Sequence, residues 1–106
     1  MLCMITQRLN KIQKRIDTIK RNLVEIGVMR PGSLTKQKQK RASTGKVSEY
    51  WQLSYTHRMK SRTDYVREDN VTQTRAQIKE FKRFKKLVEE WSELAIEQAK
   101  LLAMIE

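Results

Sequence analysis

The side chains best suited to bind a ligand lie in residues 50–67, YWQLSYTHRMKSRTDYVR. In an extended strand Gln52, Thr56 and Arg58 would share one face, and Trp51 would lie on the other. Gln and Arg can hydrogen-bond to base edges, and a two-stranded ribbon fits the major groove of DNA. The spacing therefore indicates a nucleic-acid contact face, with the Trp51 side packed inward.

Basic residues in neighbouring segments would extend this contact face. The residues predicted to contact nucleic acid are Lys36, Lys38, Lys40, Arg41, Lys46, Gln52, Thr56, Arg58, Lys60, Arg62, Arg67, Lys82, Arg83 and Lys86. Segment 35–46, TKQKQKRASTGK, is too poor in apolar residues to fold alone, which predicts either a mobile basic arm or a solvated linker. Exposed Tyr50 or Tyr65 could also stack on unpaired bases, although core packing is the commoner role of strand aromatics.

The charge balance favours an anionic partner. The 106 residues contain 23 Lys and Arg against 12 Asp and Glu, a net charge of +11. Residues 30–67 contain ten basic and two acidic residues, whereas residues 87–106 contain one and five. This distribution favours nucleic acid, although net charge alone also fits a merely soluble basic protein.

Signatures of enzymes and metal sites are absent from the sequence. It contains no Gly-rich phosphate loop or nucleophile elbow, and Cys3 and His57 cannot by themselves form a disulfide or a structural zinc site. Glu89, Glu93 and Glu97 recur every four residues without the His partner of di-iron sites, so they predict a solvated acidic face. We expect no enzymatic activity and no cofactor. The charged N-terminal segment predicts neither a signal peptide nor a membrane span, hence a cytoplasmic protein.

Two heptad patterns predict long helices over residues 1–28 and 69–106. Gly27 and Pro31-Gly32 would end the first helix, and no Gly or Pro interrupts the second after Val71. The seam of the second helix would consist of Phe81, Phe84, Val88, Trp91, Ala95, Gln98, Leu102 and Ile105, beside a third row of Leu87, Leu94 and Leu101. Between the helices we expect a basic loop over 29–49 and a β-hairpin over 50–67.

These elements predict a mainly α fold with a small β-hairpin, in a single domain of residues 1–106. Two long, antiparallel, coiled-coil-like helices are joined by the basic loop and the hairpin head, which places Ile26 near Phe81 and Ile5 near Leu102. The third apolar row widens the stripe enough for a second neighbour. That neighbour is either another copy, which would make a four-helix homodimer, or the chain's own loop or hairpin folded back.

Four motifs, MRPGSL (29–34), YWQLSYTHRMKS (50–61), YV (65–66) and KRFKKLVEEWSEL (82–94), resemble those of a family of short bacterial and archaeal proteins of unknown function. In that family a Pro-Gly-Ser-Leu segment precedes a Tyr-Trp-x-Leu-Ser-Tyr-Thr strand, a Gly-Lys turn and a long helix. The resemblance covers most of residues 29–100. It implies no particular activity, but it implies a link to mobile elements, beside which members of the family occur.

The sequence departs from this family in two places. Many members carry a cysteine cluster before the strand, whereas residues 35–49 contain none, so the metal-binding knuckle which that cluster suggests is not expected here. The Gly-Lys turn is replaced by Met59-Lys60, so a turn that needs a positive φ at the glycine would be strained or reshaped. We expected residues 59–61 to make the reversal between the two strands.

Taken together, these patterns predict a non-enzymatic nucleic-acid-binding protein, with DNA favoured over RNA. A homodimer and a larger nucleoprotein or enzyme complex are the expected assemblies, with no membrane partner. The alternative is a subunit or inhibitor that docks on a larger nucleic-acid enzyme through its basic head or its broad apolar helix face.

Overall fold

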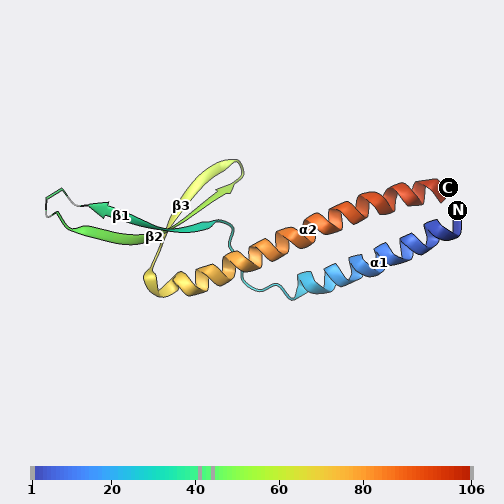
Figure 1. The fold of residues 1–106 in the computed structure, drawn as a ribbon, viewed down its shortest axis with the longest axis horizontal. Helices are drawn as coiled ribbons and strands as arrows, with labels where there is room; N and C mark the ends of the chain where they lie inside the picture. The colour runs from blue at the N-terminus through green and yellow to red at the C-terminus, as the bar shows by residue number, and fades with distance from the viewer. Residues whose placement is uncertain (1, 41, 44, 106) are drawn as a thin grey trace. The chain divides into compact units, whose positions relative to one another are not determined.

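The computed structural model describes residues 2–40, 42–43 and 45–105. The elements follow one another in the order α1 (Leu2–Val24), β1 (Ser33–Lys40), β2 (Val47–His57), β3 (Lys60–Val66), the 3-10 helix η1 (Glu68–Asn70) and α2 (Val71–Ile105) (Figure 1). The predicted fold class is confirmed, because two long antiparallel helices contact each other and a small antiparallel sheet separates them in the sequence.

The chain divides into two compact units. The helical unit consists of residues 1–26 and 83–106, and the sheet unit consists of residues 27–82. Helix α2 contributes its first turns to the sheet unit and the rest to the helical unit. Within the described part of the chain, no helix is long and apolar enough to cross a membrane.

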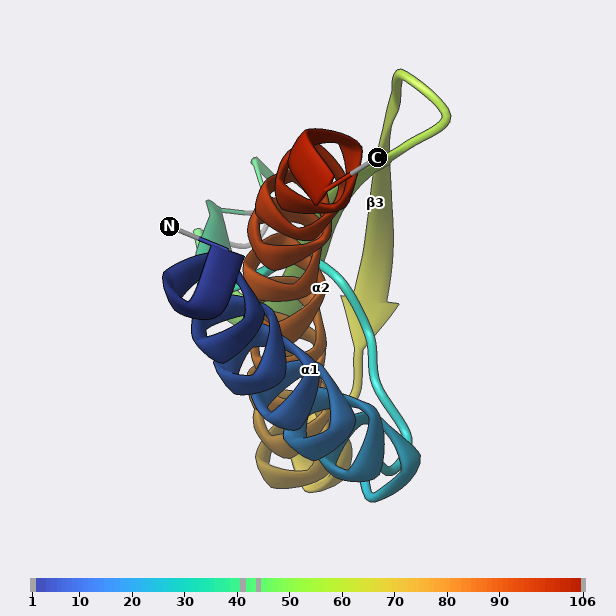
Figure 2. The same ribbon diagram turned by 90° about the vertical axis from the view of Figure 1, so that its right-hand side faces the viewer.

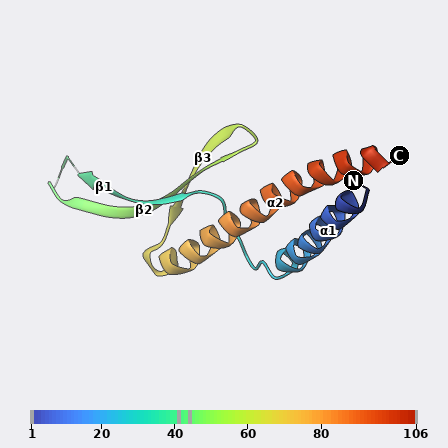
Figure 3. The same cartoon turned by 45° about the vertical axis from the view of Figure 1, so that its right-hand side comes forward.

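Antiparallel ion pairs fix the direction of the two helices in the helical unit, which lie side by side in Figures 2 and 3. The pairs are Arg8–Glu97 (2.8 Å), Arg15–Glu90 (2.6 Å) and Glu25–Arg83 (3.7 Å). As the residue number rises along α1, the residue number of the ion-pair partner on α2 falls. The predicted antiparallel pairing is therefore confirmed. Glu97, one of the glutamates of the predicted solvated acidic face, accepts two hydrogen bonds from the Arg8 guanidinium, and its side chain remains 41% exposed.

The core of the helical unit corrects the predicted seam of α2. Ile12, Ile16 and Ile19 of α1 are buried, and so is Leu87 of α2. The residues one and two heptads further along α2, Leu94 and Leu101, are half-buried. The row assigned as a third stripe therefore packs on α1, together with Trp91 and Gln98 of the predicted seam, which contact Lys20 and Gln13. On the predicted seam, Val88 and Leu102 remain 37% and 50% exposed.

The predicted loop over 29–49 is wrong, because residues 33–40 form the edge strand β1 of a three-stranded sheet in the order β1-β2-β3. Its register runs from Ser33 opposite Ser54 to Lys40 opposite Val47. The amino-acid composition of this segment does not indicate a strand, because backbone hydrogen bonds to β2 provide its stability. Lysines are also common on edge strands, where their charge discourages pairing with another chain.

Strands β2 and β3 form the predicted hairpin, but the reversal lies at Arg58-Met59 and not at residues 59–61. His57 pairs directly with Lys60, so the loop has two residues. Both have a positive φ, 53° for Arg58 and 66° for Met59, as in a type I′ turn. Arg58 and Met59, which both carry a Cβ, thus adopt the left-handed conformation that favours glycine.

The core of the sheet unit lies between the sheet and the first turns of α2. Leu53, Val66 and Ile78 are buried at its centre, and the half-buried Leu34, Trp51, Tyr55 and Val71 surround them. The predicted inward packing of the Trp51 side is thus confirmed. The 27–32 connection is held against α2 by two backbone N–H groups: that of Arg30 donates to the Gln77 carbonyl oxygen and that of Gly27 to Glu80 Oε2.

The first helix ends earlier than predicted, at Val24 and not at residue 28. The next two amides, of Glu25 and Ile26, donate to the carbonyl oxygens of Asn22 and Leu23, three residues back. These two hydrogen bonds form a tighter last turn and satisfy carbonyl groups at the end of the helix.

Candidate nucleic-acid interface

The strand register divides the charged side chains of the sheet unequally between its two faces. Directly opposed residues of antiparallel strands project to the same side. By this rule, the side of the sheet that bears Leu53 also bears Lys36, Lys38, Lys40, Lys60 and Arg62. We call these five residues the cationic face.

The opposite side of the sheet carries no charged strand residue among those described. Its members are Ser33, Thr35, Gln37, Gln39, Ser48, Tyr50, Gln52, Ser54, Thr56, Ser61, Thr63 and Tyr65. We call this set the tyrosine face. All of its members except the two tyrosines are small hydroxyl or amide residues.

The sheet therefore separates residues that were predicted to share one contact face. Gln52 and Thr56 lie on the tyrosine face, whereas Lys60 pairs with His57 and Arg62 pairs with Tyr55 on the other side. The expected frame of Lys60 and Arg62 around Gln52 and Thr56 does not form. The reason is that side chains alternate between the two sides of a strand, so residues that are close in sequence can lie on opposite sides of the sheet.

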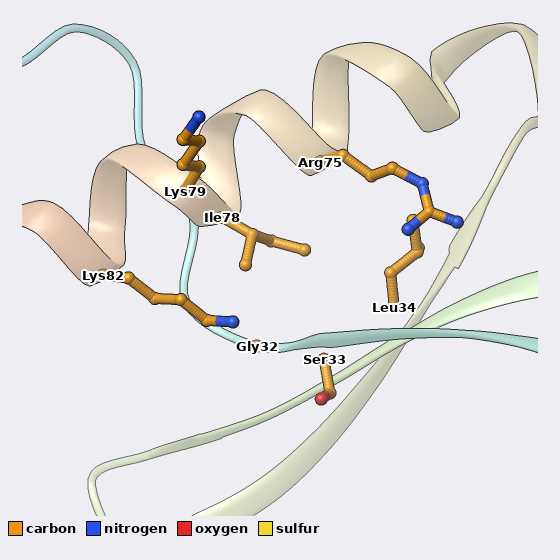
Figure 4. Close-up of a pocket in the computed structure, with 7 residues that line it drawn as sticks. All are labelled: Gly32, Ser33, Leu34, Arg75, Ile78, Lys79 and Lys82. Atoms are coloured by element: carbon orange, nitrogen blue, oxygen red, sulfur yellow. The ribbon is translucent and has the colours of Figure 1, made fainter.

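Helix α2 brings three further cations to the cationic side of the sheet unit. Arg75, Lys79 and Lys82 line a cleft of about 320 Å³. The other residues of its lining are Gly32, Ser33, Leu34 and Ile78. In Figure 4, Lys82 extends toward the start of β1 and Arg75 extends past Leu34. Of these three cations, only Lys82 is among the predicted contact residues; the spacing of four and three residues from Arg75 to Lys79 to Lys82 is the signal in the sequence that points to the other two.

Trp51 connects the cations of β1 with those of α2. The Lys36 ammonium lies 5.6 Å from the centre of the Trp51 ring, and the Arg75 guanidinium lies 5.2 Å from it. Both distances are within the range of cation–π attraction. The indole thus holds two positive groups on the Leu53 side, although its own burial is only partial.

Acidic neighbours neutralise some cations of the sheet unit and leave others uncompensated. Glu49 contacts Lys36 at 2.8 Å and Lys38 at 4.0 Å. The hydrogen bond from Lys36 lowers the pKa of Glu49, and the same bond raises the pKa of Lys36, so both groups are charged at neutral pH. Within the described ranges, no ion pair involves Lys40, Arg58, Lys60, Arg62, Lys79 or Lys82.

The remaining predicted contact residues lie elsewhere. Arg67 follows β3 and faces Asp69 at 3.8 Å, while Arg83 and Lys86 belong to the helical unit, where Arg83 contacts Glu25. Lys46 lies in the β1–β2 connection just before β2, and Arg41 lies outside the described residues.

The described residues contain no group of three or more His, Cys, Asp or Glu that could hold a metal ion. Comparison of the chain with family models, with curated proteins and with solved structures finds no match.

Proposed function

We propose that this chain is a non-enzymatic nucleic-acid-binding protein whose sheet unit holds phosphates on its cationic face. The observation that carries the proposal is the segregation of all five strand cations, Lys36 to Lys40 and Lys60 to Arg62, to one side of the sheet. The cleft cations of α2 lie on the same side, since Arg75 stacks on Trp51. Phosphate groups are the ligands that such a row of ammonium and guanidinium groups attracts most strongly.

The charge of the sheet unit supports the same proposal. Residues 27–82 contain 13 Lys and Arg against 5 Asp and Glu, a net charge of +8. Alternate lysines on β1 are spaced by about 6.6 Å, which gives a linear array rather than a point charge. A linear array suits a linear polyanion, and DNA is the proposed ligand ahead of RNA.

The proposal is tested by fluorescence anisotropy with duplex DNA, single-stranded DNA and a structured RNA at several salt concentrations. Neutralising two cleft cations, in Lys79→Gln/Lys82→Gln, should weaken binding and flatten the plot of log K against log salt by about 1.8 on duplex DNA. The matched control is Lys11→Gln/Lys14→Gln on α1, which removes the same charge from exposed positions of the helical unit. It should leave the slope almost unchanged.

Three results would contradict the proposal. They are undetectable binding at low ionic strength, binding that does not depend on salt, and equal losses in the cleft variant and its control. The first of these would favour the alternative role, in which the chain docks on a larger nucleic-acid enzyme.

The proposal includes self-association through the flank of α2 that α1 leaves exposed. Val88 and Leu102 are 37% and 50% exposed, and Ala95 lies between them on the same side of the helix at intervals of seven residues. Two copies that bury these flanks against each other would form a four-helix bundle. Sedimentation should then detect a dimer, which Leu102→Lys dissociates. A monomer at all concentrations would contradict this assembly.

A further inference from the structure

The tyrosine face bears a pair of stacked aromatic rings that the cationic face does not use. The ring centres of Tyr50 and Tyr65 are 6.0 Å apart, and the ring planes are inclined by 24°. Tyr65 is 71% exposed, an unusual position for a large aromatic side chain. Within the described residues, neither hydroxyl has a hydrogen-bond partner. One ring therefore supports the other, while most of the surface of Tyr65 is open.

A shallow hollow lies beside this pair. It has a volume of about 280 Å³ and is lined by Gln39, Ser48, Glu49, Tyr50 and Tyr65. Gln39 and Ser48 are directly paired across β1 and β2, so their amide and hydroxyl groups project together on the tyrosine face. The hollow thus combines an aromatic wall with the neutral groups of Gln39 and Ser48 and with Glu49, whose carboxylate is paired with Lys36. Aromatic rings and polar side chains are the groups that bind the face and the edge of a planar heterocycle.

Charge decides which part of a nucleic acid this face can bind. Phosphates gain nothing from a face without cations, and a duplex presents phosphates and grooves rather than ring faces. An unpaired base is neutral and planar, and it can stack on a tyrosine ring. Cations that could hold the connecting phosphates lie close by in the chain, since Lys38 and Lys40 flank Gln39 on β1 and project to the opposite side of the same edge strand.

We infer that the Tyr50–Tyr65 pair is a stacking platform for unpaired nucleobases, so that the preferred ligand is a single strand. The inference rests on the proposed nucleic-acid binding and narrows it. A base stacks on the open side of Tyr65, and its edge meets the groups of Gln39 and Ser48. The phosphates on either side of that base bind the lysines at the end of β1. Because stacking does not depend on base identity, the site prefers single strands without strong sequence specificity.

The experiment compares two labelled 20-nucleotide single strands, one of thymidylate and one of abasic sites with the same number of phosphates. Anisotropy titrations use the full chain and the variants Tyr65→Ala, Tyr65→Phe and Thr63→Ala. Thr63 lies two residues before Tyr65 on β3 and on the same face, so it is the matched control. Tyr65→Ala should weaken thymidylate binding by about 5-fold to 100-fold and leave abasic binding within about twofold. Tyr65→Phe and Thr63→Ala should bind like the parent chain.

The abasic strand separates failure of this inference from failure of the proposed function. If the parent chain binds both strands equally, or if Tyr65→Ala keeps its affinity for thymidylate, the stacking platform is wrong and phosphate binding stands. If the parent chain binds neither strand, both are wrong. A shift of Tyr65→Ala from dimer to monomer in sedimentation, without a loss specific to thymidylate, would overturn the inference in favour of a protein interface. In a Trp91→Phe background, unchanged emission of Trp51 shows that the sheet unit of each variant is folded.

Discussion

Replacing Gly32 by Ala should detach the start of β1 from β2. Gly32 has a φ of +131°, which side chains with a Cβ rarely adopt. A Cβ at this position would lie 2.8 Å from the Ser54 carbonyl oxygen and 2.9 Å from Leu53 Cδ1. The oxygen belongs to the backbone of the central strand, so it cannot rotate away without disturbing the sheet. Leu53 is fully buried and has little room to move.

The size of the effect follows from three contributions. A residue held in a disfavoured backbone region costs about 1–3 kcal/mol. Overpacking against Leu53 and the Ser54 carbonyl adds about 1–3 kcal/mol. Alanine lowers the conformational entropy of the unfolded chain relative to glycine, and this offsets about 0.4–1 kcal/mol of the destabilisation. Gly32→Ala should therefore lower the free energy of unfolding of the sheet unit by about 2–4 kcal/mol.

The chain offers two matched controls for this substitution. Gly45 has a φ of +68°, but no atom of the described residues lies within 4 Å of an added Cβ, so Gly45→Ala isolates the backbone strain. Gly27 has neither a positive φ nor a neighbour within 4 Å. Gly45→Ala should cost about 1 kcal/mol, and Gly27→Ala should be neutral or slightly stabilising.

Urea unfolding followed by tryptophan emission can measure the free energy of unfolding of the sheet unit in each of these variants. The chain has two tryptophans, and Trp51 lies in the sheet unit whereas Trp91 lies in the helical unit. A Trp91→Phe background leaves Trp51 as the only reporter of the sheet. The expected order of destabilisation is Gly32→Ala, then Gly45→Ala, then Gly27→Ala. If Gly32→Ala costs no more than Gly45→Ala, the close approach to Ser54 does not constrain the strand and the reasoning is refuted.

Two further predictions concern the hairpin turn and the helix pair. Met59→Gly should stabilise the sheet unit by about 1 kcal/mol, because the φ of 66° strains a methionine but not a glycine, whereas Met59→Ala should give no gain in the same Trp51 assay. The hydrogen bond from Arg15 lowers the pKa of Glu90 from its ordinary value of 4.5. The pair therefore stabilises the helical unit fully at a pH above 4.5, and this stabilisation is lost as the pH falls through the lowered pKa. In a Trp51→Phe background, the urea midpoint reported by Trp91 should therefore fall as the pH is lowered below 4.5, and Arg15→Gln should flatten this dependence. An identical pH profile in the variant would contradict the assignment.

Local periodicity made the helices and their direction predictable. Apolar residues three and four apart mark one side of a helix whatever surrounds it, and the apolar sides of two helices in one chain can then pack on each other. Which row of α2 meets α1 was not predictable in this way, because α2 has three adjacent apolar rows. Burial distinguishes them in the structure: Leu87 is buried in the core of the helical unit, and Glu90 and Glu97 lie where they pair with Arg15 and Arg8 of α1.

Strand β1 shows why the candidate site was only partly predictable. Its composition resembles that of a disordered segment, and its stability depends on β2, which follows it in the sequence. A local signal was nevertheless present, since Lys36, Lys38 and Lys40 alternate with Gln37 and Gln39. Regular alternation of charged and uncharged residues is typical of a strand whose two sides meet different surroundings.

The same alternation connects the two proposed binding surfaces. A slip of one residue in the pairing of β1 with β2 would move the three lysines to the tyrosine face and the two glutamines to the cationic face. Phosphate binding and base stacking would then compete for one surface. Gly32 opposes such a slip, because a slip would bring Pro31 or Ser33 to the position where a Cβ meets the Ser54 carbonyl oxygen. The glycine at the start of the strand thus determines which groups each face presents, although on this account it contacts no ligand itself.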